Sequence, residues 1–88
     1  MATYIVSYDL LKPGQNYERL YDAIKSYTRW ARVNESLWAV VTTNTAVQIR
    51  DNLSKYIDAN DRIFVVKSGV EAAWRNSICK SEWLKENL

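Results

Sequence analysis

Asp9 is the residue whose type and position most suggest chemistry, because it ends the apolar stretch TYIVSYDL and directly follows Tyr8. A carboxylate at this place has two interpretations. It caps the loop that contains Pro13 by accepting backbone N–H groups, a frequent role of Asp in turns. Alternatively, it is a chemically active group held at the end of a sheet strand. Both interpretations remain open at the level of the sequence.

Few other side chains offer catalytic chemistry. The chain contains no His, which excludes a His-Asp triad and a His-ligated zinc site, and its single Cys79 has no His to activate it. Ser7 and Ser36 also lack a neighbouring base. Glu35, in the bend NES, is either a second carboxylate near Asp9 or a solvated bend residue.

Basic and aromatic residues gather in the segment YTRWAR, residues 27–32. Such a segment suits contacts with phosphates and a stacked base. The alternative is a helix C-terminus, where cations are favoured, with Trp30 packed on the core. A net charge of +2 does not itself demonstrate nucleic-acid binding. The residues that we expect to contact RNA or DNA are Lys12, Arg29, Arg32 and Ser36.

The apolar periodicity predicts the elements that position these residues. We expect strands at 3–9, 31–34, 36–43 and 62–67, and helices at 16–27 and 45–57. Asn16 is a candidate N-cap, and Thr45 with Gln48 forms a capping-box pattern. The order βαββαβ predicts an α+β fold of the ferredoxin-like type. We expect a single domain at 1–88, with its core at 2–67 and a tail at 68–88 that contains a short C-terminal helix.

Both faces of the predicted strands are apolar, as in sheets that are covered on both sides. Two helices cover one face only, so the C-terminal tail, a partner chain or both must cover the other. We expect a homodimer, because 48% of the 88 residues are hydrophobic, and exposed apolar patches usually mark interfaces. The residues expected at the dimer contact are Tyr4, Tyr8, Trp38 and Trp74.

The chain begins without a signal-peptide pattern, and no apolar run approaches the roughly 20 residues of a membrane span. We therefore expect a cytoplasmic protein without a membrane partner.

Two motifs, one after the other along the chain, resemble those of the small CRISPR-associated adaptation protein Cas-two. They are YIVSYDL at 4–10 and RVNESLW at 32–38. The family has an apolar strand ending in Tyr-Asp and then, after a helix, Val-Gln-x-Ser-Val-Phe. The resemblance covers residues 3–67, and the tail segments EAAW and WLKENL are similar to short SinR-family, Cas-two-like chains. Virulence-associated protein D is more distantly similar, and Asn34 and Trp38 depart from the family's Gln and Phe.

This resemblance implies a ferredoxin-like homodimer packed sheet against sheet, with Asp9 paired with its dimer mate. In some family members that Asp is proposed to hold Mg²⁺ or Mn²⁺ for cleavage, whereas other members serve as scaffolds for DNA or for another protein. We therefore expect a homodimer that acts on or scaffolds nucleic acid, in phage or mobile-element defence or counter-defence. The alternatives are a metal-dependent endonuclease that uses Asp9 from each protomer, and a nucleic-acid-binding regulator.

Overall fold

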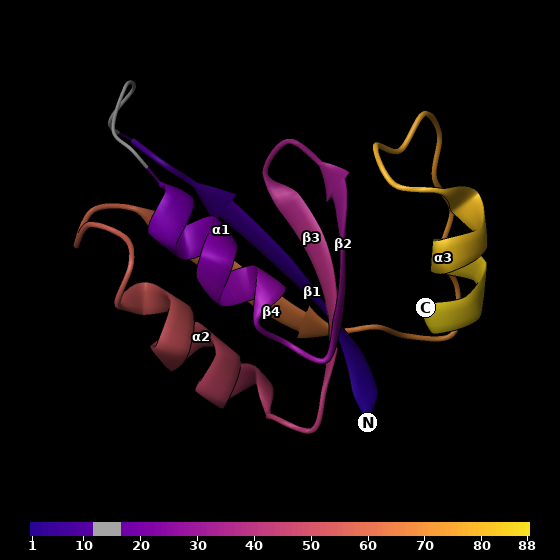
Figure 1. Cartoon of the computed structure of the whole chain (residues 1–88), viewed down its shortest axis with the longest axis horizontal. Coiled ribbons are helices and arrows are strands. Elements are labelled where there is room, and N and C mark those ends of the chain that lie inside the picture. The colour runs from indigo at the N-terminus through magenta and orange to yellow at the C-terminus, as the bar shows by residue number, and fades with distance from the viewer. Residues whose placement is uncertain (12–16) are drawn as a thin grey trace.

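A computed structural model of the chain describes residues 1–11 and 17–88. It contains a four-stranded antiparallel sheet and three helices, so the protein is a small α+β structure (Figure 1). The elements along the chain are β1 (Ala2–Asp9), α1 (Glu18–Lys25), β2 (Arg29–Asn34), β3 (Leu37–Thr42), α2 (Ala46–Ser54), β4 (Arg62–Lys67) and α3 (Ser81–Asn87).

The strand order in the sheet is β2-β3-β1-β4, so β1 is central and β2 and β4 form the edges. Val6 lies opposite Trp38 of β3 on one side and Val65 of β4 on the other. The apolar stretch that ends in Asp9 is therefore a central strand, with a hydrogen-bonded neighbour on each edge.

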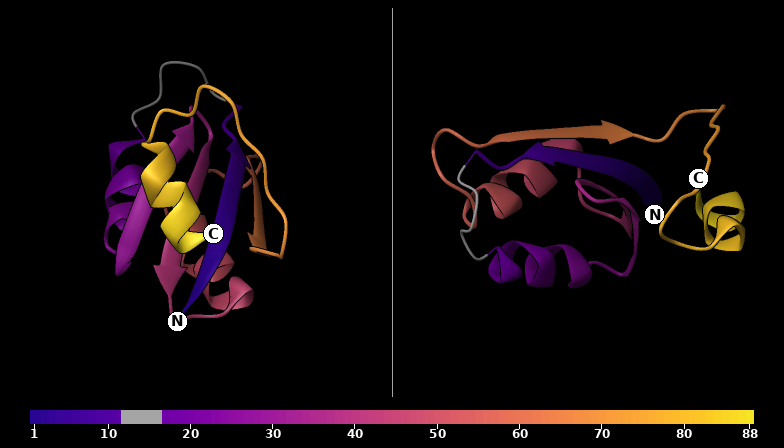
Figure 2. Two further views of the ribbon diagram at one scale, coloured as in Figure 1. Left: turned by 90° about the vertical axis from the view of Figure 1, so that its right-hand side faces the viewer. Right: turned by 90° about the horizontal axis from the view of Figure 1, so that it is seen from above.

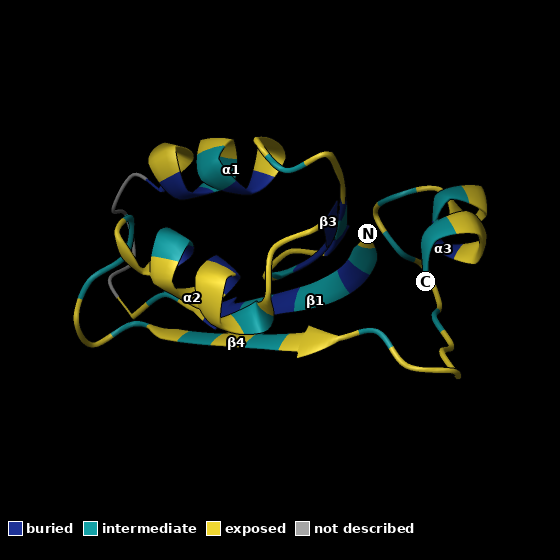
Figure 3. Cartoon of the chain, turned by 90° about the horizontal axis from the view of Figure 1, so that it is seen from below, coloured by how far each residue is buried: buried dark blue, intermediate teal, exposed yellow. Residues whose placement is uncertain are grey.

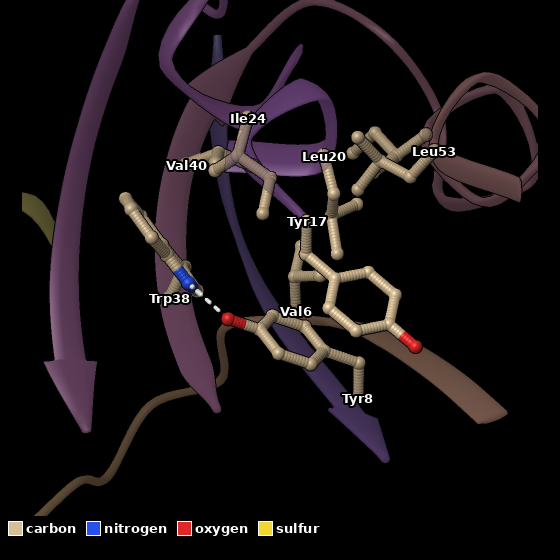
Figure 4. Close-up of a cluster of buried hydrophobic side chains, with 9 residues drawn as sticks. Val6, Tyr8, Tyr17, Leu20, Ile24, Trp38, Val40 and Leu53 are labelled. Carbon is tan, nitrogen blue, oxygen red and sulfur yellow. Dashed lines mark hydrogen bonds between the residues drawn. The ribbon is translucent and has the colours of Figure 1, made fainter. Parts of the chain in front are cut away.

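Helices α1 and α2 cover one face of the sheet, called here the inner face (Figures 1 and 2). The buried residues are spaced four apart in both helices, Leu20 and Ile24 in α1, and Ile49 and Leu53 in α2. Figure 3 shows that the buried side of α1 faces the sheet. The buried residues of this core are Val6, Tyr8, Tyr17, Leu20, Ile24, Trp38, Val40, Ile49 and Leu53 (Figure 4).

The start of α2 confirms the expected capping box. The Gln48 backbone N–H donates to the Thr45 hydroxyl at 3.2 Å, and the Thr45 N–H donates to the Gln48 side-chain oxygen at 2.9 Å. These two bonds satisfy N–H groups that a helix start otherwise leaves without partners. The helix ends at Ser54, three residues before the expected end at Ile57.

The first helix is shorter than expected, and the second strand starts earlier. The Ser26 hydroxyl donates to the Ala23 carbonyl at 2.6 Å, a local bond that competes with helix continuation. Arg29 and Trp30 then pair with Val41 and Val40 of β3, so they belong to β2 and not to a helix C-terminus. The expected N-cap Asn16 and the expected ligand contact Lys12 lie outside the described residues.

The C-terminal tail crosses the other face of the sheet, called here the outer face (Figure 2). The short helix expected there is present as α3, and its buried Leu84 forms a cluster with Val33 and Ala39. The segment between β4 and α3 contains neither helix nor strand. The tail leaves the outer side of β4 open, where Phe64 and Val66 are 64% and 43% exposed. No helix in the described part of the chain is long and apolar enough to cross a membrane.

Candidate functional site

Residues from the end of β1, from α1, from the turn between β2 and β3 and from the tail meet at one end of the sheet. The Tyr8 backbone N–H donates to the Ser36 carbonyl at 3.1 Å, which holds the turn against the end of β1. An open depression of about 520 Å³ lies there, and it is called here the strand-end depression. The residues that line it are Tyr8, Asp9, Leu10, Tyr21, Arg32, Glu35, Ser36 and Ile78. Four residues selected from the sequence, Asp9, Arg32, Glu35 and Ser36, are thus brought together.

A chain of hydrogen bonds runs beneath this depression. The Trp38 indole N–H donates to the Tyr8 hydroxyl at 2.9 Å (Figure 4), and that hydroxyl donates to the Glu35 carbonyl at 3.2 Å. Burial raises the pKa of Tyr8 above its ordinary value, while the bond from Trp38 opposes that rise. Because the raised pKa favours the protonated hydroxyl, Tyr8 serves as a hydrogen-bond donor to the Glu35 carbonyl.

Arg32 is held in place by the same turn. Its Nη2 and Nε atoms donate to the Glu35 carbonyl at 2.6 and 3.2 Å. Its guanidinium carbon also lies 5.0 Å from the Tyr21 ring centre and 5.2 Å from the Trp38 ring centre. These contacts stabilise a cation over aromatic faces and order its side chain. Much of the hydrogen-bonding capacity of Arg32 is therefore used within the chain.

Asp9 lies at the rim of the depression with an exposed carboxylate. Its side chain is 68% exposed and forms an ion pair with Arg62 at 3.6 Å. Within the described residues, no group of three or more His, Cys, Asp or Glu side chains is close enough together to hold a metal ion. Asp9 and Glu35 are the two acidic residues that line the depression. A divalent cation at Asp9 would also meet the positive charge of Arg62, which disfavours binding.

Asp61, in the turn before β4, performs the loop-capping role that was one interpretation of Asp9. Its carboxylate accepts the backbone N–H groups of Leu11 and Asp58, each at 2.8 Å. It thereby ties the chain after β1 to the turn before β4. The sequence signal was the segment DAND, because Asp in a turn commonly accepts nearby backbone N–H groups.

A second group of side chains lies at the start of β2 and at the end of α1. It consists of Lys25, Arg29 and Trp30, and it is called here the β2 edge cluster. Trp30 is 39% exposed, and the Lys25 ammonium lies 5.3 Å from its ring centre. The Trp30 ring also contacts the ring of the buried Trp38, with 5.7 Å between ring centres. Arg29 is exposed on the same edge strand, and because side chains alternate along a strand, it points to the face of the sheet opposite to that of Trp30.

The residues expected at a dimer contact are placed mainly inside the protomer. Tyr8 and Trp38 are only 5% and 1% exposed, so the helices of their own chain already cover them. Tyr4 packs against the same core. Trp74 is half-buried on the outer face, and its indole N–H donates to the Ser81 hydroxyl at 3.2 Å. Tyr8 and Trp38 therefore have almost no surface left to offer a partner.

No protein-family model matches the chain, and no solved structure matches it.

Proposed function

We propose that this protein is a Cas-two-like scaffold with a ferredoxin-like fold that binds nucleic acid without cleaving it. The proposed fold is supported by the order βαββαβ, the strand order β2-β3-β1-β4 and the two helices on one face. Fold type alone does not determine function, so the argument for binding depends on the side chains.

The observation that carries the proposal is the β2 edge cluster. Arg29 forms no ion pair with the described residues, and Lys25 contacts the ring of Trp30. Exposed cations attract backbone phosphates, and an exposed ring stacks on a base of any sequence. A base that stacks on Trp30 would displace the Lys25 ammonium, which is then free to contact the adjoining phosphate. This arrangement favours single-stranded RNA or DNA, whose bases are accessible.

Scaffolding is favoured over cleavage by the surroundings of Asp9. The carboxylate is exposed and paired with Arg62, and in the described part of the chain it has no cluster of further metal ligands. A metal-dependent endonuclease remains the second candidate, because Asp9, Glu35 and Ser36 converge on one depression. That candidate requires Mg²⁺ or Mn²⁺ and a second protomer that supplies another Asp9.

The proposed homodimer is restricted to the outer side of β4. The tail occupies the rest of the outer face, which leaves Phe64 and Val66 as the exposed apolar residues there. A stable interface usually buries about 1,200–2,000 Å² in total, so neighbouring surface must also contribute.

The binding proposal is tested by fluorescence anisotropy with labelled single-stranded RNA, single-stranded DNA and duplex DNA. Trp30→Ala is expected to weaken single-strand binding about five- to 150-fold, because stacking contributes ~1–3 kcal/mol per base. Arg29→Gln is expected to weaken binding to every strand and to reduce its salt dependence. The matched control is Arg50→Gln on α2, whose exposed guanidinium is paired with Asp51 at 2.9 Å.

Two results would contradict the binding proposal. One is an unchanged affinity in Trp30→Ala, and the other is an equal loss of affinity in Arg50→Gln. Incubation of the bound oligonucleotides with Mn²⁺ separates scaffolding from cleavage, since a scaffold leaves them intact.

The dimer is tested by light scattering at high micromolar concentration. Phe64→Asn is expected to shift the protein toward the monomer, whereas Val47→Asn is the control on the helix side, because Val47 is 55% exposed. A wild-type protein that is strictly monomeric would remove the dimer from the proposal and leave nucleic-acid binding to be judged by the anisotropy experiment.

A further inference from the structure

An apolar cavity of about 290 Å³ lies between the outer face of the sheet and the tail. It shares no lining residue with the strand-end depression. Each strand of the covered part of the sheet contributes one apolar side chain, and the tail supplies the opposite wall. The apolar residues with the largest side chains in its lining are Ile5, Val33, Leu37, Trp74, Leu84 and Leu88.

The walls of this cavity are held together by hydrogen bonds around it. The Ile78 backbone N–H donates to the Val33 carbonyl at 2.8 Å, which attaches the tail to β2. The Trp74 indole N–H bonds to Ser81, and the Thr3 hydroxyl of β1 donates to the Asn87 carbonyl. The cavity is therefore a product of two bonds that attach the tail to the sheet and of the Trp74–Ser81 bond within the tail, and closing it would require these bonds to shift.

The volume sets the size of a ligand. A protein cavity of about 150 Å³ lined by Leu, Ile and Phe stays dry and binds benzene. A cavity of about 290 Å³ therefore has room for two fused rings or for a branched chain of similar size. Filling it restores van der Waals contacts that the lining side chains otherwise lack.

The polar lining of the cavity sets the chemistry of the ligand. Two polar residues line it, Asn34 and Arg75, and no acidic side chain does. Among the described residues, Arg75 has no ion-pair or hydrogen-bond partner. Asn76 follows with a φ of 56°, a left-handed conformation that Asn tolerates and that turns the chain directly after Arg75. A guanidinium at an apolar cavity matches a carboxylate, which it binds through two parallel N–H bonds.

We propose that this cavity binds a small apolar carboxylate about two fused rings in size, with its carboxylate on Arg75. The apolar part lies between the sheet and the tail, and the amide of Asn34 supplies a further polar contact. The proposal is independent of nucleic-acid binding, because the cavity and the β2 edge cluster have no residue in common.

The test uses naphthoate and the neutral naphthalene methanol, which share a ring system and differ in charge. Isothermal titration is expected to show naphthoate binding to the full chain and about tenfold weaker binding to Arg75→Gln, since tenfold corresponds to the ~1.4 kcal/mol of a charged hydrogen bond. Naphthalene methanol is expected to bind both proteins equally. Leu37→Trp places a large ring in the cavity and is expected to abolish binding of both probes.

The proposal is overturned if neither probe binds, if naphthoate binds wild type and Arg75→Gln equally, or if both probes still bind folded Leu37→Trp. Displacement of bound naphthoate as the protein concentration rises would also overturn it, because a second copy of the chain would then occupy the cavity. Where Leu37→Trp fails to fold, the comparison with Arg75→Gln decides, since Arg75 is exposed and its replacement leaves the packing intact.

Discussion

The two ends of β2 hold their arginine side chains differently. At the end next to the turn, Arg32 donates two hydrogen bonds to the Glu35 carbonyl and lies against two aromatic rings. At the start of the strand, Arg29 forms no ion pair with the described residues. In the first region the cation already has a hydrogen-bond acceptor within the chain. In the second, Lys25 contacts the partly exposed ring of Trp30, and Arg29 is exposed on the same edge strand. Polar groups that already have partners gain little from a ligand, because a new bond only replaces an old one. The contrast favours the β2 edge cluster as the binding surface.

Trp38 connects the two regions and gives the largest expected effect. Its ring contacts Trp30 and Arg32, and its indole N–H bonds to Tyr8. Trp38→Ala leaves a cavity in the core and is expected to cost about 3–5 kcal/mol, a large share of the ~5–15 kcal/mol typical of a domain. Urea unfolding measures this loss. Trp30→Ala is the control, and an equally large loss in that variant would contradict the assignment of Trp30 to the surface.

Tyr8→Phe probes the bonds beneath the strand-end depression. It removes the acceptor of the buried Trp38 N–H and is expected to cost about 1–3 kcal/mol in urea unfolding. The control is Tyr4→Phe, because the Tyr4 hydroxyl has no hydrogen-bond partner among the described residues. Similar losses in the two variants would show that the network contributes nothing specific.

The same tyrosine predicts a dependence of stability on pH. Burial raises the pKa of Tyr8 above its ordinary value of 10.0, with the Trp38 bond opposing, so folding favours the protonated hydroxyl. The contribution of Tyr8 to the free energy of unfolding is fully present below its pKa in the unfolded state, about 10. It is lost as the pH rises through the higher pKa of the folded state. The free energy of unfolding of wild type should therefore fall more steeply above about pH 10 than that of Tyr8→Phe. Parallel curves would contradict the burial of this hydroxyl.

Asp9→Asn gives the smallest expected change. An exposed ion pair such as Asp9–Arg62 contributes about 0–1 kcal/mol to stability, so the melting temperature should change little. The matched control is Asp51→Asn, which removes the exposed ion pair with Arg50. Melting with and without Mn²⁺ tests the alternative function. Stabilisation of wild type by Mn²⁺ that is absent in Asp9→Asn, together with cleavage of RNA or DNA, would favour the endonuclease over the scaffold.

Much of the sheet could be predicted from local patterns. The strand at 62–67 has the expected bounds, and the capping box at Thr45 is confirmed, because both depend on neighbours in sequence. The prediction placed the start of β2 too late. Arg29 and Trp30 are extended because they pair with β3, and this pairing between distant segments cannot be read from local propensity.

The candidate site was predictable in part. Alternation along β1 puts Val6 and Tyr8 on one face, and both belong to the core. It does not say which face the helices cover, so Tyr8 and Trp38 were assigned to a partner when they belong to the core. Asp9 and Arg32 line one depression because segments distant in the sequence lie together there, and this has no short-range signal. The DAND turn indicates that Asp61 accepts nearby N–H groups, but it does not reveal the bond to the distant Leu11.

The central claim, binding at the β2 edge cluster, is tested most directly by the indole N–H resonances of the four Trp residues. Titration with a short single-stranded RNA, followed by two-dimensional NMR, is expected to shift the Trp30 resonance most and that of the adjoining Trp38 less. The resonances of Trp74 and Trp83, which lie in the tail on the outer face, should stay in place. A Trp30 signal that does not move while RNA binds, or larger shifts in the tail, would contradict the account.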